Sequence, residues 1–254
     1  AELVIGFLVF GTALQYTGAG AFFINLAFAL CGHYRGGAAK VAIFSSGLLG
    51  SMSGSVISNV LTTGTMTIPA MKKTGFKPSV AAAIEACAST GAVLAPPVMG
   101  ATAFVMAEFL NVPYSDVALA AAVPAALYFF ALFMQIDFNA GRNSMIGMPR
   151  EEMPKLRDVF RDGWYFIFVI ILLVVLLLVM KRENWAPWLA TGLLLVLNQL
   201  FSDRRWGWNE VLVFLEGNGR VFVELVAILA GIGLLVGSFS LTGLTGTLTT
   251  ELLY

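Results

Sequence analysis

Residues 47–65 read GLLGSMSGSVISNVLTTGT, and this run of Gly, Ser and Thr lies inside an uncharged stretch over residues 41–71. As one straight helix that stretch would be about 46 Å long, half as long again as the hydrocarbon core of a bilayer. Both of its flanks are basic, and basic flanks favour the cytoplasmic side of a membrane. The sequence therefore predicts a re-entrant helical hairpin over residues 41–71 that turns at Ser53-Gly54-Ser55 and returns to the cytoplasm.

The composition of the whole chain is that of a membrane protein. Of its 254 residues, 58% are hydrophobic and only 12% are charged, and the mean hydropathy is +0.84. The charged fraction is about half that of a typical soluble domain. The net charge of zero gives no indication of a nucleic-acid partner. With one histidine and no metalloprotease or paired-aspartate motif, the sequence predicts neither an enzyme nor a bound cofactor.

The charged residues divide the remainder of the chain into further hydrophobic segments, and we predict an all-α polytopic membrane protein. The predicted segments are a first span over residues 1–32, a proline-broken helix over 79–110, transmembrane helices over 117–201 with a cytoplasmic loop over 137–162, and a last apolar segment over 221–254. Residues 206–219, between the last two, are predicted to form an interfacial helix or loop. The basic loops orient the first span and the last segment in opposite directions.

These two oppositely oriented segments begin alike. From Glu2 the chain reads ELVIGFLVFGTALQYTGAG, and from Glu224 it reads ELVAILAGIGLLVGSFSLTGLTG. The likeness is weak and needs a gap of about three residues, so chance is one explanation. The other is an inverted-topology repeat, typical of secondary transporters, whose second copy is cut off after Tyr254. The absence of an initiator Met also indicates part of a longer protein.

Two non-helical stretches are expected to meet near the membrane midplane, the hairpin tip with Asn59 and the stretch from Ser89-Thr90-Gly91 to Ala95-Pro96-Pro97. Proline lacks a backbone donor, so carbonyl oxygens near Ala92 and Val93 are expected to lose their helical partners. Such oxygens, with Ser, Thr and Asn side chains, are suitable sodium ligands. The alternative is that the small residues only let helices pack closely.

Glu85 is the one acidic residue deep in the first half of a predicted span. A buried acid would be a coupling residue, because carboxylates inside a membrane are costly. However, Glu85 lies only about two turns after Lys77, and we interpret it as an interfacial residue.

Residues 47–110 as a whole resemble the large membrane subunit of tripartite ATP-independent periplasmic (TRAP) transporters. The features that carry the resemblance are the Ser-Gly-Ser tip, an exit motif made of Ile68, Pro69, Met71, Lys73, Gly75 and Phe76, and the small-residue helix that ends at Pro96-Pro97. Asn59 and the Ala95-Pro96-Pro97 break are most similar to the fused small-plus-large permeases that work with TAXI-type binding proteins.

The resemblance implies an elevator-type secondary transporter of the bacterial inner membrane. A periplasmic binding protein would deliver a small organic anion, often a carboxylate, and sodium ions would drive its uptake. A small membrane subunit would be a further partner, whether separate or fused. The resemblance implies sodium ligands at Ser53, Gly54, Ser55, Asn59, Thr90, Gly91, Ala95 and Pro96, and substrate contacts at Ser53, Gly54, Ser55, Thr90 and Pro96.

Without a second hairpin and a second broken helix, the chain corresponds to about the first half of such a subunit. Two alternatives remain at this point. One is another sodium-coupled dicarboxylate carrier with the same inverted repeat. The other is a membrane scaffold subunit that transports nothing.

Overall fold

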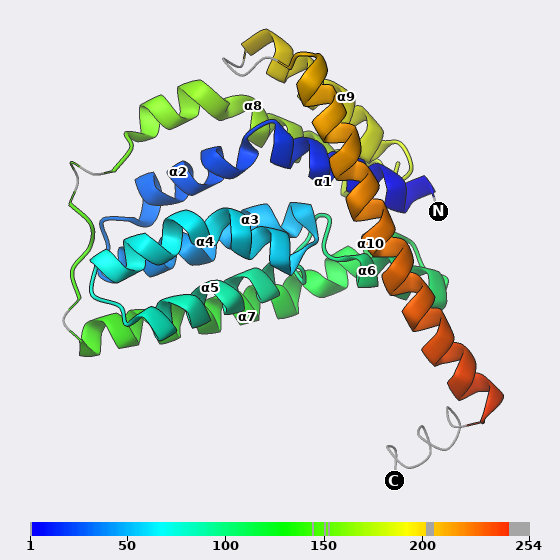
Figure 1. Cartoon of the computed structure of the whole chain (residues 1–254), viewed down its shortest axis with the longest axis horizontal. Coiled ribbons are helices and arrows are strands. Elements are labelled where there is room, and N and C mark those ends of the chain that lie inside the picture. Colours follow the sequence, from blue (N-terminus) through cyan, green and yellow to red (C-terminus); the bar gives the residue numbers. More distant parts are fainter. Residues whose placement is uncertain (1, 144, 150, 152, 202–205, 244–254) are drawn as a thin grey trace. The chain divides into compact units, whose positions relative to one another are not determined.

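A computed structural model describes residues 2–143, 145–149, 151, 153–201 and 206–243 of the chain (Figure 1). The regular structure in these residues is helical, and the predicted all-α polytopic membrane fold is confirmed. Within the described part of the chain, three helices are long and apolar enough to cross a membrane, and a bent pair near the N-terminus makes a fourth candidate span.

The helices follow one another through mostly short connections. They are α1 (Glu2–Tyr16), α2 (Ala19–Cys31), α3 (Gly37–Ser53), α4 (Val56–Lys73), α5 (Pro78–Ala92), α6 (Ala101–Leu110), α7 (Tyr114–Arg142), α8 (Leu156–Val174), α9 (Ala186–Phe201) and α10 (Trp208–Leu241), with a π-helical segment, Val175–Val179, directly after α8. The chain divides into two compact units, residues 1–214 and residues 215–254. The described part of the second unit is the remainder of α10 and the turn that ends it.

The first predicted span is bent rather than straight. Helices α1 and α2 meet at 67°, because Gly18 takes the left-handed conformation (φ 93°) and interrupts the helix. The Thr17 hydroxyl donates to the carbonyl of Ala13 at 2.8 Å. Thr242 donates to the carbonyl of Ser238 at the same distance, and Gly243 follows with φ 71°. The two Thr-Gly pairs thus end their helices in the same local geometry.

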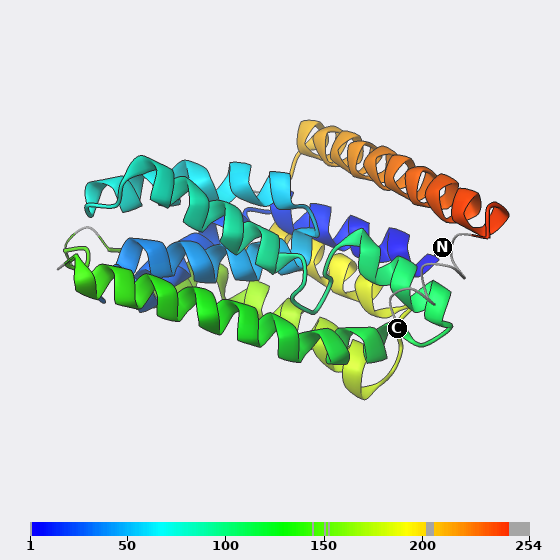
Figure 2. The same ribbon diagram turned by 90° about the horizontal axis from the view of Figure 1, so that it is seen from below.

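The centre of the first unit is formed by α3, α4 and α5, which pack against one another, with α7 alongside α3 and α5 (Figures 1 and 2). Small residues allow these helices to approach closely. A Cβ atom on Gly50 of α3 would lie 2.4 Å from the Cβ of Ala92 on α5. On the other side of α3, a Cβ on Gly11 of α1 would lie 2.5 Å from the carbonyl oxygen of Met52.

Two predicted boundaries are wrong. The cytoplasmic loop predicted over residues 137–162 is shorter, because α7 continues through Asp137 to Arg142 and α8 begins at Leu156. Asp137 can remain helical because its charge is paired with Arg35 and with the buried Lys40. The segment predicted as interfacial over residues 206–219 is largely continuous with the last apolar helix, since α10 begins at Trp208. Residues 202–205 and 244–254, which include Arg204, Arg205 and the end of the predicted second repeat, lie outside the described residues.

Candidate functional site

The hairpin tip lies where the Gly-Ser pattern predicts a turn. Helix α3 ends at Ser53, and Gly54 closes it in the left-handed conformation (φ 65°), with its backbone N–H bonded to the carbonyl of Gly50 at 3.0 Å. Ser55 is extended, and its hydroxyl accepts the backbone N–H of Ser58 at 3.4 Å, which caps the start of α4. The structure thus has a helix–turn–helix here, while re-entry into the membrane stays a prediction.

The second non-helical stretch separates α5 from α6 over residues 93–100. The carbonyls that we expected to be free are not free. The carbonyl of Ala92 accepts the N–H of Ala95 at 3.1 Å, and that of Val93 accepts the N–H of Gly100 at 2.9 Å. Both carbonyls have lost their helical partners, as predicted, but each has another donor, because the chain turns back on itself after Ala95 and brings the N–H of Gly100 to Val93. A carbonyl oxygen still keeps a second lone pair for a ligand.

The tip and the break are in direct contact. The N–H groups of Val98 and Met99 donate to the carbonyl of Ser51 at 3.1 and 3.0 Å. A Cβ atom on Gly54 would lie 2.6 Å from the carbonyl oxygen of Met99. The hydroxyl of Tyr114, at the start of α7, donates to the carbonyls of Pro97 and Val98 and holds the break from the other side. We refer to this contact between Ser51–Ser55 and Val98–Gly100 as the junction.

The predicted site residues divide into two groups. Ser53, Gly54 and Ser55 lie at the tip itself. Asn59 is fully buried one turn into α4, where its amide nitrogen donates to the carbonyl of Ser46 at 3.0 Å. Its neighbour across the helices is Gly50, on which a Cβ would lie 2.6 Å from the same nitrogen. These four predicted residues therefore belong to the hairpin and its junction with the break.

The other four predicted residues, two at the end of α5 and two in the break, face elsewhere. Thr90 is exposed, and its hydroxyl donates to the carbonyl of Ala86 within its own helix at 2.8 Å. Gly91 faces α7, since a Cβ there would lie 2.2 Å from the ring of Tyr128. Ala95 and Pro96 line an apolar hollow of about 520 Å³ together with aromatic residues of α3 and α7. A shared sodium or substrate site that includes these four residues stays a prediction.

Two buried oxygen atoms of the hairpin have no hydrogen-bond partner among the described residues. They are the hydroxyl oxygen of Ser53 and the side-chain carbonyl oxygen of Asn59. An unpaired buried oxygen costs about 1–3 kcal/mol, so such atoms usually have a partner. A cation or a bound water would supply that partner at both atoms.

We interpreted Glu85 as an interfacial residue, but its side chain is completely buried among the helices of the cluster. One oxygen of its carboxyl group accepts the hydroxyl of Ser46 at 2.8 Å and that of Thr63, and lies 3.5 Å from the hydroxyl of Ser89. The other oxygen accepts the hydroxyl of Thr67 at 2.5 Å. We call Ser46, Thr63, Thr67 and Ser89 the hydroxyl cage.

The sequence does contain a signal for this cage. Asn59, Thr63 and Thr67 follow one another at intervals of four, which places three polar side chains on one face of a helix. Glu85 and Ser89 have the same spacing on the next helix. We judged Glu85 by its distance along the chain from Lys77, and that distance does not show what the neighbouring helices bring to the same depth.

The basic loops of the helix cluster lie together at one of its ends. The loop between α2 and α3, the loop between α4 and α5 and the end of α7 gather at one end, on the left in Figures 1 and 2. Arg35 of the first loop pairs with Asp137 of α7, and this hydrogen bond raises the pKa of Arg35. Lysines Lys72, Lys73 and Lys77 lie around the second loop. One end of the cluster therefore carries most of its positive charge.

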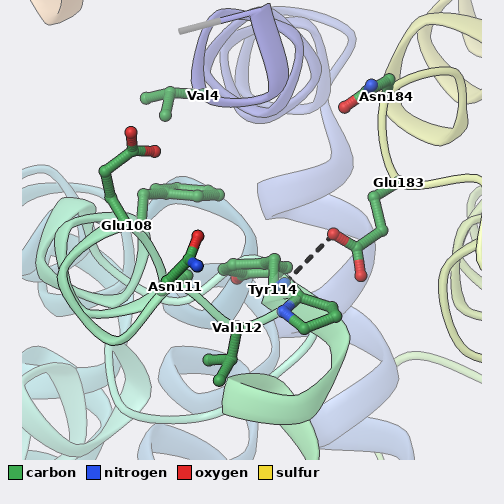
Figure 3. Close-up of a pocket in the computed structure, with 10 residues that line it drawn as sticks. Val4, Glu108, Asn111, Val112, Tyr114, Glu183 and Asn184 are labelled. Atoms are coloured by element: carbon green, nitrogen blue, oxygen red, sulfur yellow. Dashed lines mark hydrogen bonds between the residues drawn. The ribbon is translucent and has the colours of Figure 1, made fainter.

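A polar pocket of about 560 Å³ lies at the other end, between α6, α7 and the connection before α9 (Figure 3). Glu183 projects into it and accepts the backbone N–H groups of Tyr114 and Ser115 at 3.1 and 2.9 Å. A carboxylate at a helix N-terminus stabilises it through unpaired donors and the helix dipole. We therefore interpret Glu183 as a cap of α7, apart from the junction.

Comparison with known proteins identifies the family. Residues 1–254 match the family described as "Tripartite ATP-independent periplasmic transporter, DctM component". The chain belongs to this family. The resemblance that we noted on the hairpin and the broken helix is thereby confirmed, and the chain is part of the large membrane subunit of a TRAP transporter.

Curated relatives of this DctM-family chain carry matching descriptions. It is 29% identical over 144 residues to the C4-dicarboxylate TRAP transporter large permease protein DctM of Pseudomonas aeruginosa, which covers 57% of this chain and 33% of that protein. It is 33% identical over 91 residues to a putative TRAP transporter large permease protein of Haemophilus influenzae, covering 36% of this chain and 21% of that protein. A DctM protein of Rhodobacter capsulatus is 30% identical over a segment of the same length. The matched segments thus span a third or less of these relatives.

Proposed function

We propose that this chain is part of a sodium-coupled permease that imports a small organic anion, in the simplest case a carboxylate, across a bacterial inner membrane. The observation that carries the proposal is the pair of unpaired buried oxygens on Ser53 and Asn59 beside the junction. Neutral oxygens at an interrupted helix are a typical environment for sodium in secondary transporters. The names of the Pseudomonas and Rhodobacter relatives favour a dicarboxylate as the substrate.

The substrate would reach the permease from a periplasmic binding protein, and a small membrane subunit, fused or separate, would be its membrane partner. The helical hairpin and broken helix support this plan, since discontinuous helices carry the sites of such carriers. The matching helix ends at Thr17-Gly18 and Thr242-Gly243 support an inverted repeat that begins again in α10. An elevator movement of the hairpin cluster would then carry the ion and the anion.

We expect Ser53→Ala and Asn59→Ala to weaken sodium-dependent uptake in the full-length protein more than they lower its amount in the membrane. Each change removes one of the two unpaired oxygens, and losing one such contact costs about 1–3 kcal/mol. The sodium concentration for half-maximal uptake should rise several-fold to about a hundredfold. Uptake of labelled dicarboxylate at a series of sodium concentrations measures this change.

Thr62→Ala is the matched control for this experiment. Thr62 lies on the same helix, but its hydroxyl is exposed and already donates to the carbonyl of Ser58 at 2.8 Å. Ser55→Ala is less specific than Ser53→Ala, because the Ser55 hydroxyl also caps α4. An unchanged sodium dependence in both Ser53→Ala and Asn59→Ala would leave these residues with a packing role only.

We expect the loops over residues 33–40 and 72–77 to face the cytoplasm together. Both are basic, and they lie at one end of the helix cluster (Figure 1). After removal of Cys31 and Cys87, single cysteines at Tyr34 and Lys73 should react with an impermeant reagent only from the cytoplasmic side. A cysteine at Val112, in the turn between α6 and α7, should react only from the periplasmic side. Labelling of the two basic loops from opposite sides would rule out the re-entrant hairpin.

A further inference from the structure

Among the residues that the structure describes, Glu85 has no ion-pair partner. It is fully buried, and among the described residues no Lys, Arg or His nitrogen lies within ion-pair distance of its carboxyl group. The nearest cationic side chain along α3 is Lys40, six residues before Ser46, and Lys40 is paired with Asp137. An isolated carboxylate inside a protein is costly, and it either gains a counter-charge or takes up a proton.

The other charged and titratable groups of the helices around Glu85 are engaged elsewhere or lie toward the helix ends. Lys72 and Lys73 end α4, at least five residues after Thr67. On α5 itself, the Cys87 side chain is exposed, and its backbone carbonyl accepts the hydroxyl of Tyr128 from α7 at 2.9 Å. Asp137, also on α7, belongs to the ion pairs with Arg35 and Lys40. The environment of the Glu85 carboxyl group is therefore made of neutral hydroxyls.

The hydroxyl cage can form hydrogen bonds with Glu85 in either protonation state without moving a heavy atom. Thr63 and Thr67 each have two acceptors within reach, the Glu85 carboxyl group and the carbonyl one turn earlier, at 2.8 and 3.0 Å. A hydroxyl has one hydrogen and can rotate it to either acceptor. With Glu85 ionised, the hydrogens point to its oxygens. With Glu85 protonated, the threonines turn to the backbone carbonyls and one hydroxyl oxygen accepts the new proton.

The oxygens of the hydroxyl cage are closely spaced, with 3.0 Å between the hydroxyls of Ser46 and Thr63 and 2.8 Å between the Ser46 hydroxyl and the carboxyl oxygen of Glu85. A sodium ion would have to force these oxygens apart and would compete for the lone pairs that hold the hydrogens. A proton fits the spacing as it stands.

From this geometry we propose that Glu85 is a proton-binding residue of the transport cycle. Its carboxyl group takes a proton from water when the cage opens toward one side of the membrane and releases it toward the other. The proton is held between Glu85 and the rotating hydroxyls of Thr63 and Thr67. This inference rests on the proposed transport function, and it adds to the permease a coupling ion other than sodium, held about one helix turn from Asn59.

The test is infrared spectroscopy of the full-length protein through a pH titration, which reports the carbonyl band of a protonated carboxyl group and needs no transport. We expect such a band to titrate in the wild type, to vanish in Glu85→Gln and to remain in Glu108→Gln, the matched control on α6. A carbonyl band that is unchanged in Glu85→Gln would overturn the proposal. A band that disappears when sodium is added at constant pH would also overturn it.

Uptake then tests coupling separately from proton binding. At a fixed sodium gradient, we expect wild-type uptake to vary with pH and Glu85→Gln to lose that variation, whereas Glu108→Gln keeps it. Wild-type uptake that does not vary with pH would overturn the coupling role, as would Glu85→Gln uptake with the same pH dependence as the wild type. If the full-length protein shows the infrared band but no uptake of any dicarboxylate, the proposed transport function fails while proton binding by Glu85 stands.

Discussion

Replacing Pro96 and Pro97 together with alanine is expected to abolish uptake by the full-length protein while leaving it inserted in the membrane. Each proline withholds a backbone donor and disfavours a continuous helix by about 3 kcal/mol relative to alanine. The double change therefore allows α5 to run directly into α6. Because no charge is altered, insertion should be preserved. Uptake in vesicles, measured beside the amount of inserted protein, checks both parts.

The energetic balance favours this outcome. The junction is held by the bonds of Val98 and Met99 to the carbonyl of Ser51 and by the Tyr114 hydroxyl. Each such hydrogen bond contributes about 1 kcal/mol net. The sum of these hydrogen-bond energies is smaller than the free energy by which two alanines favour a continuous helix over two prolines. The break would then straighten, and the hairpin tip would lose the backbone against which it packs.

Pro124→Ala provides the matched control, because Pro124 lies inside α7, where the helix already continues past it. We expect its uptake to stay near the wild-type level. Near-normal uptake by the Pro96→Ala, Pro97→Ala protein would show that the break is not needed for transport. The assignment of Thr90, Gly91, Ala95 and Pro96 to the site would then be withdrawn.

The sequence predicts what depends on local chemistry. The turn at Gly54 could be predicted because glycine readily adopts the left-handed conformation that closes α3. The interruption before Pro96 could be predicted because proline cannot continue a helix hydrogen-bond pattern. The stretch at Thr17-Gly18 carried the same kind of signal, and we interpreted it as part of one span because the segment around it is uncharged. Its bend follows from the left-handed Gly18.

The sequence does not predict what depends on pairing between distant elements. Asp137 looked like the start of a loop, but Arg35 and Lys40, about one hundred residues earlier, neutralise it and keep it in α7. The carbonyl of Val93 looked free, but Gly100 returns to it. Glu85 looked interfacial, but residues of two other helices enclose it. In each case the partner lies on another turn or helix, and spacing along the chain gives no measure of that distance.

Gly54→Ala is expected to reduce uptake by at least about tenfold, the consequence of roughly 1.4 kcal/mol of lost stabilisation in the transporting state. Alanine in the left-handed conformation costs about 1–2 kcal/mol. In addition, its Cβ would lie 2.6 Å from the Met99 carbonyl oxygen, a backbone atom that cannot rotate away. The tip and the break must therefore separate. Uptake at saturating sodium and the midpoint of thermal unfolding measure the two consequences.

Gly75→Ala separates the effect of the contact with the Met99 carbonyl from the effect of alanine at a positive φ. Gly75 also has a positive φ, 99°, but no atom lies within 4 Å of the position that its Cβ would take. Both variants should unfold a few degrees earlier than the wild type, since each carries similar strain. Only Gly54→Ala should lose uptake, because only its methyl group pushes the junction apart. Equal losses of uptake in the two variants would assign the effect to stability alone, and the contact between tip and break would then have no separate role in transport.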